Sequence, residues 1–270
     1  MNLKKALNIK NLLIGSILTV GMSTSAMANV GGVVFDPNSP FDWTSNSQLI
    51  EDQLDPGPDG AFFTADDVVT SLSGFGLVTG INNTLQNVFC PASCEVTYQF
   101  GGFALSSVVP DPTPGSTDTF LGFTGGWINF YVDSTTAYDG DNMASATNGL
   151  NWLMMAGHSS FSAIHGMNTT INATLSSFAV GTDTGVGSGL LDVIGGLAMG
   201  ILDTNGEAQG ADMVFSTSFQ PIPGGAQPDG LELFGTSDFR GSSAVPEASS
   251  LALLGLGLLG FGASMRRKKA

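Results

Sequence analysis

The strongest constraint on the fold is a two-residue alternation of apolar and polar side chains that recurs through the middle of the chain. In CEVTYQF, the apolar residues Val96, Tyr98 and Phe100 alternate with polar ones. WINFYVD and DMVFSTSF follow the same pattern. Successive side chains of a β-strand point to opposite faces of its sheet, so this alternation is typical of strands with one buried face.

Turn-forming residues separate the alternating segments. DPNSP, DPGPDG, VPDPTPGSTD and DTNGEAQG combine Gly, Pro, Asp and Asn, and glycine supplies 37 of the 270 residues, about twice its usual share. The chain shows no long amphipathic helix, although residues 64–71 and 142–155 are candidates for short ones. With eight to ten expected strands, the sequence predicts an all-β fold, an antiparallel β-sandwich or jelly-roll-like single domain.

Charge is segregated along the chain. All 23 Asp and Glu lie between Asp36 and Glu247, whereas seven of the eight Lys and Arg lie in the two ends. Residues 29–247 therefore hold one Arg against 23 acids, a formal charge of −22. Such a surface repels nucleic acid and anionic lipid headgroups and attracts cations, so we expect no nucleic-acid partner.

The N-terminus has the organisation of a secretory signal peptide. Three Lys precede an apolar stretch, and Ala26-Met27-Ala28 then places small residues at the positions that signal peptidase requires. We expect a signal peptide of residues 1–28 and an exported acidic β domain of residues 29–243. An uncleaved N-terminal anchor is the alternative.

The C-terminal tail, residues 244–270, joins an apolar run to a cluster of cations. Residues 249–265 carry no charge, and a run of about 17 residues is at the short limit for a helix that crosses a bilayer. Four cations follow the run and would stop transfer and stay in the cytoplasm: Arg266, Arg267, Lys268 and Lys269. We expect a precursor with an exported body and a transmembrane helix in the inner membrane.

The short motif Val245, Pro246, Glu247 and Ala248 stands just before this run. Pro246 prevents a regular helix from extending backward through it, which leaves an extended peptide beside the membrane. The order Pro-Glu, apolar helix with spaced Gly, and RRKK resembles the PEP-CTERM sorting signal of Gram-negative bacteria. The resemblance covers about 25 residues, and Ala248 stands where the motif has a second Pro. It implies that exosortase, a membrane-embedded cysteine transpeptidase, cuts there and releases or re-attaches the protein.

Cys90 and Cys94 are the only cysteines. An even pair in an exported chain favours a disulfide over the metal or redox chemistry that the same spacing would suggest in a reducing cytosol. A ring this small removes little entropy from the unfolded chain, so it should rigidify the turn before Glu95 more than it stabilises the whole domain.

The segment DPGPDGAFFTADD clusters Asp55, Asp59, Asp66 and Asp67. Carboxylates spaced around Gly turns can hold Ca²⁺, so these four residues are the candidate metal ligands and Ca²⁺ is the one cofactor considered. The segment lacks the spacing of an EF-hand. Turn-forming acids without a metal are the simpler interpretation.

No sequence motif in the chain indicates a particular enzymatic reaction. G-x-S-x-G, H-E-x-x-H and Walker-type sequences are absent, and His158 and His165 would share a face only on a helix. We expect a non-enzymatic protein of the cell surface or exopolysaccharide matrix, with exopolysaccharide as a candidate partner. The alternative is a carbohydrate-binding or glycosidase-like β-sandwich, for which Trp127, Tyr131, Trp152 and Phe234 could line a sugar platform.

Overall fold

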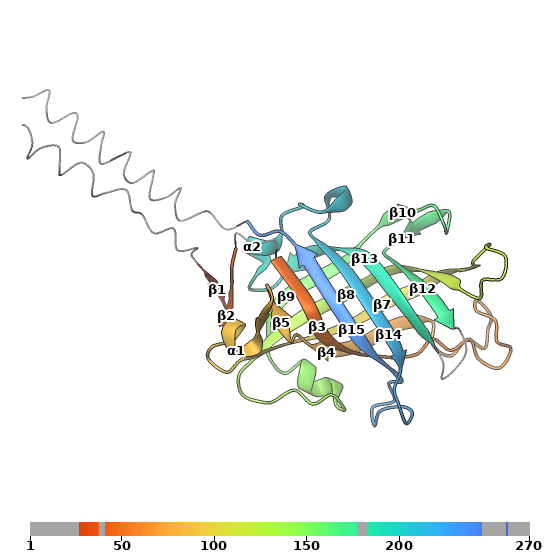
Figure 1. Cartoon of the computed structure of the whole chain (residues 1–270), viewed down its shortest axis with the longest axis horizontal. Coiled ribbons are helices and arrows are strands. Elements are labelled where there is room, and N and C mark those ends of the chain that lie inside the picture. Colours follow the sequence, from red (N-terminus) through yellow and green to blue (C-terminus); the bar gives the residue numbers. More distant parts are fainter. Residues whose placement is uncertain (1–26, 38–40, 178–182, 245–257, 259–270) are drawn as a thin grey trace, which may run out of the picture. The chain divides into compact units, whose positions relative to one another are not determined.

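The computed structural model describes residues 27–37, 41–177 and 183–244, together with Leu258. Met27–Val245 form one compact unit, which is the subject of this section (Figure 1). Almost all of the predicted signal peptide and of the predicted C-terminal transmembrane helix lies outside the described residues. Among the residues that are described, no helix combines the length and the apolar character needed to cross a membrane.

One large antiparallel sheet dominates this unit. Its strands are β3 (Phe41–Glu51), β4 (Ser71–Leu77), β7 (Glu95–Pro110), β8 (Thr119–Asp133), β9 (Leu150–His158), β12 (Ile171–Ser177), β13 (Thr184–Gly195), β14 (Met213–Pro221) and β15 (Leu233–Gly241). Their spatial order is β12-β13-β14-β15-β3-β4-β7-β8-β9, and every pairing is antiparallel.

The sheet closes on itself because β9 and β12 occupy the same gap between β8 and β13. β12 pairs with β8 over residues 119–123 and with β13 over residues 184–189. β9 pairs with the same two strands farther along, over residues 127–132 and 190–195. Eight strand positions therefore form a closed barrel, which removes the free edges of an open sheet (Figure 1).

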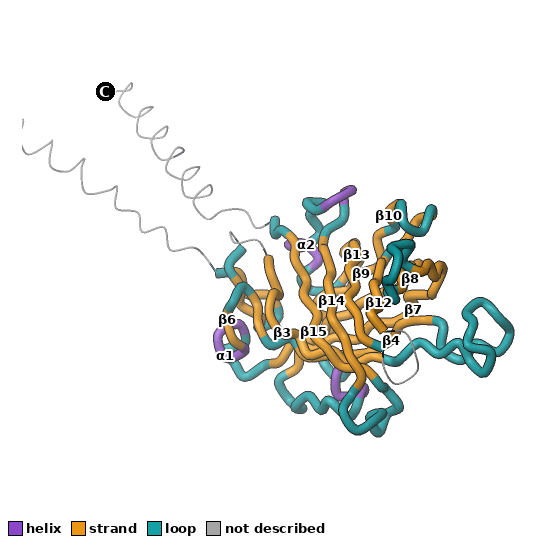
Figure 2. The backbone as a smooth tube through the Cα atoms, turned by 45° about the vertical axis from the view of Figure 1, so that its right-hand side comes forward, coloured by secondary structure: helices purple, strands orange, loops and turns teal. Residues whose placement is uncertain are grey.

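Smaller elements connect or flank the barrel strands. They are the paired strands β1 (Ala28–Val30) with β2 (Val33–Phe35), β5 (Gly80–Ile81) with β6 (Thr84–Leu85), and β10 (Ser160–Ser162) with β11 (Met167–Thr169), and the short helices α1 (Gln86–Phe89), η2 (Met143–Ala146), α2 (Met199–Leu202) and η3 (Ala208–Gly210). The helices are isolated turns between strands (Figure 2).

The predicted all-β antiparallel fold is confirmed, with the opposed walls belonging to one continuous sheet. The predicted alternation is also present in the side chains. Val96 and Tyr98 on β7 are fully buried, and so are Ile128 and Phe130 on β8. The side chains that the sequence pattern placed on one face therefore line the interior of the barrel.

The two helical candidates are wrong. In residues 64–71, a turn, two bends and the isolated β-bridge of Val69 with Asp55 lead into β4, which begins at Ser71. Residues 142–155 form only the single turn η2 before β9 begins. Leu153 and Met155 are buried strand residues, whereas Leu150, which the helical spacing had placed on the same face, is 68% exposed. The conformation here is set by the pairing of β9 with both β8 and β13, and not by the helical spacing of its apolar residues.

Aromatic side chains fill the half of the barrel that β9 closes. The rings of Phe130 and Phe239 lie 5.0 Å apart at an interplanar angle of 86°, and Tyr98 lies 5.3 Å from Phe130. The hydroxyl groups of Tyr98 and Ser237 share a 2.6 Å hydrogen bond within this core. The half that β12 closes is filled less completely and contains a cavity.

Candidate functional site

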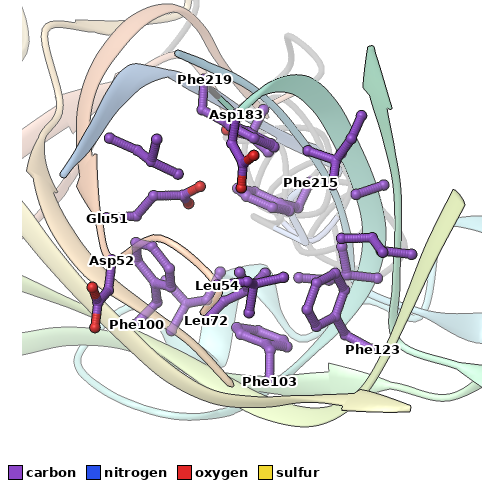
Figure 3. Close-up of a pocket in the computed structure, with 18 residues that line it drawn as sticks. Glu51, Asp52, Leu54, Leu72, Phe100, Phe103, Phe123, Asp183, Phe215 and Phe219 are labelled. Carbon is purple, nitrogen blue, oxygen red and sulfur yellow. The ribbon is translucent and has the colours of Figure 1, made fainter. Parts of the chain in front are cut away.

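The cavity inside the barrel is the candidate binding site. The space between its walls, open solvent included, is about 570 Å³. Only about 30 Å³ of that space admits the centre of a water-sized sphere, so the cavity is narrow. Its walls are mainly apolar and include Leu72, Phe100, Phe103, Phe123, Leu175 and Phe215 (Figure 3).

A bulge in β7 explains why two aromatic residues three positions apart both reach this cavity. Gly102 adopts a φ of +72° between Phe100 and Phe103, a conformation that glycine adopts without strain. At this point the register between β4 and β7 shifts by one residue, as expected for a β-bulge. The shift resets the alternation, so both Phe100 and Phe103 line the interior.

Three carboxyl groups gather at one end of the cavity. Glu51 is the last residue of β3, Asp52 follows it, and Asp183 directly precedes β13. Glu51 is 4% exposed and Asp183 is 3% exposed, whereas Asp52 is half-buried. In Figure 3, Glu51 and Asp183 project into the same space from different segments of the chain. The chain thus places acidic groups at one end of a mainly apolar cavity.

The ionisation of Glu51 is strongly perturbed by this position. Burial raises the pKa of Glu51 to about 8, and the neighbouring charges of Asp52 and Asp183 act in the same direction. At neutral pH Glu51 is therefore mainly protonated. Burial also raises the pKa of Asp52, a change that the backbone hydrogen bond from Gln53 opposes.

The four aspartates of the predicted calcium segment lie in the loop between β3 and β4. Each carboxylate accepts a hydrogen bond from within that loop. The donors are the Gly57 N–H to Asp55 (2.8 Å), the Ala61 N–H to Asp59 (2.8 Å), the Thr64 hydroxyl to Asp66 (2.8 Å) and the Phe63 N–H to Asp67 (2.9 Å). The hydrogen bond from Thr64 lowers the pKa of Asp66.

These bonds support the turn-forming interpretation of the segment. In the described parts of the chain, no group of three or more His, Cys, Asp or Glu is arranged to hold a metal ion. The calcium site at Asp55, Asp59, Asp66 and Asp67 therefore stays a prediction.

Cys90 and Cys94 form the predicted disulfide, with an S–S distance of 2.03 Å. The pair follows α1 directly and precedes β7, which begins at Glu95. Both cysteines are buried in the main hydrophobic core. The disulfide therefore fixes the short turn that leads into the longest strand of the barrel.

The two histidines have separate partners. His158 Nδ1 lies 2.8 Å from Asp192 Oδ1, and His165 Nδ1 lies 3.0 Å from the Ser107 hydroxyl. Burial lowers the pKa of His165, and the backbone of Leu121 opposes this change.

Asp212 is a structural carboxylate that sequence reasoning missed. It is 2% exposed and accepts three backbone N–H groups, from Val193 at 2.7 Å, Thr204 at 2.6 Å and Asn205 at 2.6 Å. It therefore ties β13 to the turn after α2. The sequence offers one signal for this role: Asp212 directly precedes the alternating residues of β14, a position where a polar side chain can cap the start of a strand.

Trp152 is buried in the core and cannot belong to a surface platform for sugars. Its side chain is fully buried and its indole N–H donates to the Val30 carbonyl at 2.8 Å. Trp127 and Tyr131 are half-buried residues of β8. The aromatic residues considered for carbohydrate binding therefore do not share one exposed face.

Residues 244–268 match the PEP-CTERM protein-sorting motif. The match contains Val245, Pro246, Glu247 and Ala248, the apolar run and most of the basic end, so the predicted resemblance is confirmed. The motif supports export and membrane-anchored sorting in a Gram-negative bacterium. Searches of curated proteins and of solved structures returned no match.

Proposed function

We propose that this chain, whose tail matches the PEP-CTERM sorting motif, is an exported, non-catalytic protein of the cell surface or exopolysaccharide matrix. The observation that carries the proposal is the motif at residues 244–268. In this scheme the inner membrane holds the precursor for a time, and an exosortase-type enzyme cuts the tail and releases or re-attaches the body.

The position of the motif suits such processing. The last strand, β15, ends at Gly241. The Ser243 hydroxyl donates to the Pro37 carbonyl at 2.7 Å, and the Ala244 N–H donates to the Ile201 carbonyl at 2.7 Å. The barrel is thus complete before Pro246, so a cut at the motif removes no strand and leaves these final contacts in place.

The charge of the body supports a role in a matrix. Residues 29–247 carry a formal charge of −22, and their single cation, Arg240, is exposed. Such a surface attracts divalent cations and cationic polymers, which can bridge it to acidic polysaccharide. Some carboxylates of the body accept several backbone hydrogen bonds and so have a structural role. Asp133, for example, accepts the backbone N–H groups of Ser134, Thr135 and Thr136.

The proposal is tested by expressing the full chain in an exosortase-positive Gram-negative host and in the same host without exosortase. In the first host, intact mass should show a protein that begins at Asn29, ends near Pro246 or Glu247, and fractionates with the surface or matrix. In the second, the protein should stay in the membrane with Arg266 to Lys269 attached. A normal host that accumulates only the form with the basic end would contradict the proposal.

The processed protein from this experiment also tests the alternative function, carbohydrate binding. The processed protein should give no signal on a glycan array and should not hydrolyse crude exopolysaccharide. Specific glycan binding, or hydrolysis that single Asp→Asn changes abolish, would instead favour the carbohydrate-binding or glycosidase-like function.

A further inference from the structure

We propose that the barrel interior binds a slender apolar molecule with a cationic amine head, the amine beside Glu51 and the chain among the aromatic walls of the cavity. This inference concerns the body alone and is independent of how the tail is processed.

The shape of the interior is the first argument. Protein cores are close-packed and leave few voids larger than a water molecule. The half of the barrel closed by β9 follows that rule, with Tyr98, Phe130 and Phe239 in contact. The half closed by β12 keeps a narrow cavity between mainly apolar walls, in which the centre of a water-sized sphere can occupy about 30 Å³. A narrow apolar cavity fits a hydrocarbon chain better than a broad or polar ligand.

The second argument is the carboxyl group of Glu51. It is 4% exposed and points into the cavity (Figure 3). Burying a polar group without a partner is unfavourable unless something compensates for it. A strongly perturbed carboxyl group in a cavity is a mark of a functional site. A cationic ligand head placed here would compensate for the burial of this carboxyl group.

The neighbours of Glu51 select the charge of that head. The titratable groups that line this end of the cavity are Asp52 and Asp183, and both are acids. An anionic head would add another like charge, whereas an ammonium group would be attracted to all three carboxyl groups. On binding, protonated Glu51 gives its proton to the solvent and accepts a charge-assisted N–H···O hydrogen bond from the amine.

Asp52 is the most exposed of the three acids that line the cavity. Asp52 and Phe219 line the cavity and are half-buried, whereas Glu51 and Asp183 are buried behind them. A cation approaching the anionic body therefore meets Asp52 first. The amine can then move from Asp52 to Glu51 while the hydrocarbon chain of the ligand enters the apolar part of the cavity.

Isothermal titration calorimetry of the full-length protein in lipid nanodiscs, with empty nanodiscs as the blank, tests the proposal. The probes are octylamine, 1-octanol and octanoate, which share one chain length and differ in head group. We expect octylamine to bind at least about tenfold more tightly than 1-octanol and octanoate to show no binding. At neutral pH the heat of octylamine binding should change with the ionisation enthalpy of the buffer, because Glu51 releases a proton.

Three variants locate the site. Glu51→Gln should weaken octylamine binding by about tenfold and abolish the buffer dependence, with 1-octanol changed by no more than about twofold. Ala173→Leu fills the cavity without changing charge and should abolish binding of both probes. Glu207→Gln removes an acid that does not line the cavity and should bind like the wild type.

The proposal is overturned if no probe binds, or if octylamine binds Ala173→Leu as well as it binds the wild type, since that result indicates adsorption to the acidic surface. Tighter binding of octanoate than of octylamine would overturn the choice of head group. If Ala173→Leu does not fold, the comparison of Glu51→Gln with Glu207→Gln still decides, because equal octylamine affinities would contradict the site.

Discussion

Glu51 couples the stability of the barrel to pH. Its pKa is about 8 in the folded protein, against 4.5 for an ordinary Glu, so between these values the folded state keeps a proton that the unfolded chain has lost. Its stabilising contribution is fully present below the ordinary pKa and is lost as pH rises through about 8. The charges of Asp52 and Asp183 also raise the pKa of Glu51, in the same direction as its burial.

Replacing Glu51 by Gln should remove this dependence. We expect Glu51→Gln and the wild type to melt at similar temperatures near about pH 5, and the variant to be more stable by a few kcal/mol near about pH 9. Thermal unfolding followed by circular dichroism measures this difference, and Glu207→Gln should show none. A stability difference that is the same at both pH values would show that the Glu51 carboxyl group does not titrate as proposed.

Asp212 should be among the most sensitive polar residues of the body. Asp212→Ala leaves the three backbone N–H groups that it holds without their acceptor, and each unsatisfied buried donor costs about 1–3 kcal/mol. We expect a loss of at least about 3 kcal/mol in urea unfolding, seen as a lower midpoint with an unchanged slope. The exposed Asp141→Ala should be neutral, and equal effects of the two substitutions would contradict the role of Asp212.

At the scale of elements, the sequence predicted strand faces better than strand partners. Alternation placed Val96, Tyr98 and Phe130 on buried faces because the two-residue period is a local property of each strand. Closure of the barrel depends on β9 and β12 sharing the gap between β8 and β13. That arrangement is set by contacts between distant segments, which no local pattern encodes. The same contacts overrode the helical spacing around Leu153.

The candidate site could not be predicted from the sequence for a related reason. In LIEDQLD, Glu51 stands beside Asp52 and close to Asp55, so the sequence indicates an exposed acidic turn. The structure instead ends β3 at Glu51 and turns this residue inward, as its two-residue spacing from the buried Leu49 would have allowed. Asp183, more than a hundred positions away, joins it only through the sheet. The tail motif and the disulfide were predictable because each is a short local pattern.

The disulfide makes a local contribution at this scale. A ring of about five residues should stabilise the fold by about 2 kcal/mol in the chain-entropy treatment, against about 4.7 kcal/mol for a 100-residue loop. We expect Cys90→Ser/Cys94→Ser to stay folded, with faster hydrogen exchange in α1 and at the start of β7 and little change in β14 and β15. Equal acceleration throughout the barrel would show that the disulfide holds the whole fold.

At the scale of the whole molecule, the barrel and the sorting tail should be separable. The body makes its last described contact at Ala244, immediately before the motif. A chain that keeps its N-terminal segment and stops after Ala244 should therefore be exported without a membrane-anchored intermediate. Its melting temperature should equal that of the processed protein, because no strand and no core residue has been removed.

A chain that stops after Ser237 is the matched control. It loses the pairing of Arg240 and Gly241 with β14 and β3, and it loses Phe239, which packs against Tyr98. Removing a buried Phe side chain alone costs about 3–5 kcal/mol, so this chain should be degraded or insoluble. If the chain that stops after Ala244 were equally unstable, the barrel would need its tail to fold. Sorting and folding would then be one requirement, and processing at Pro246 could not leave a stable body.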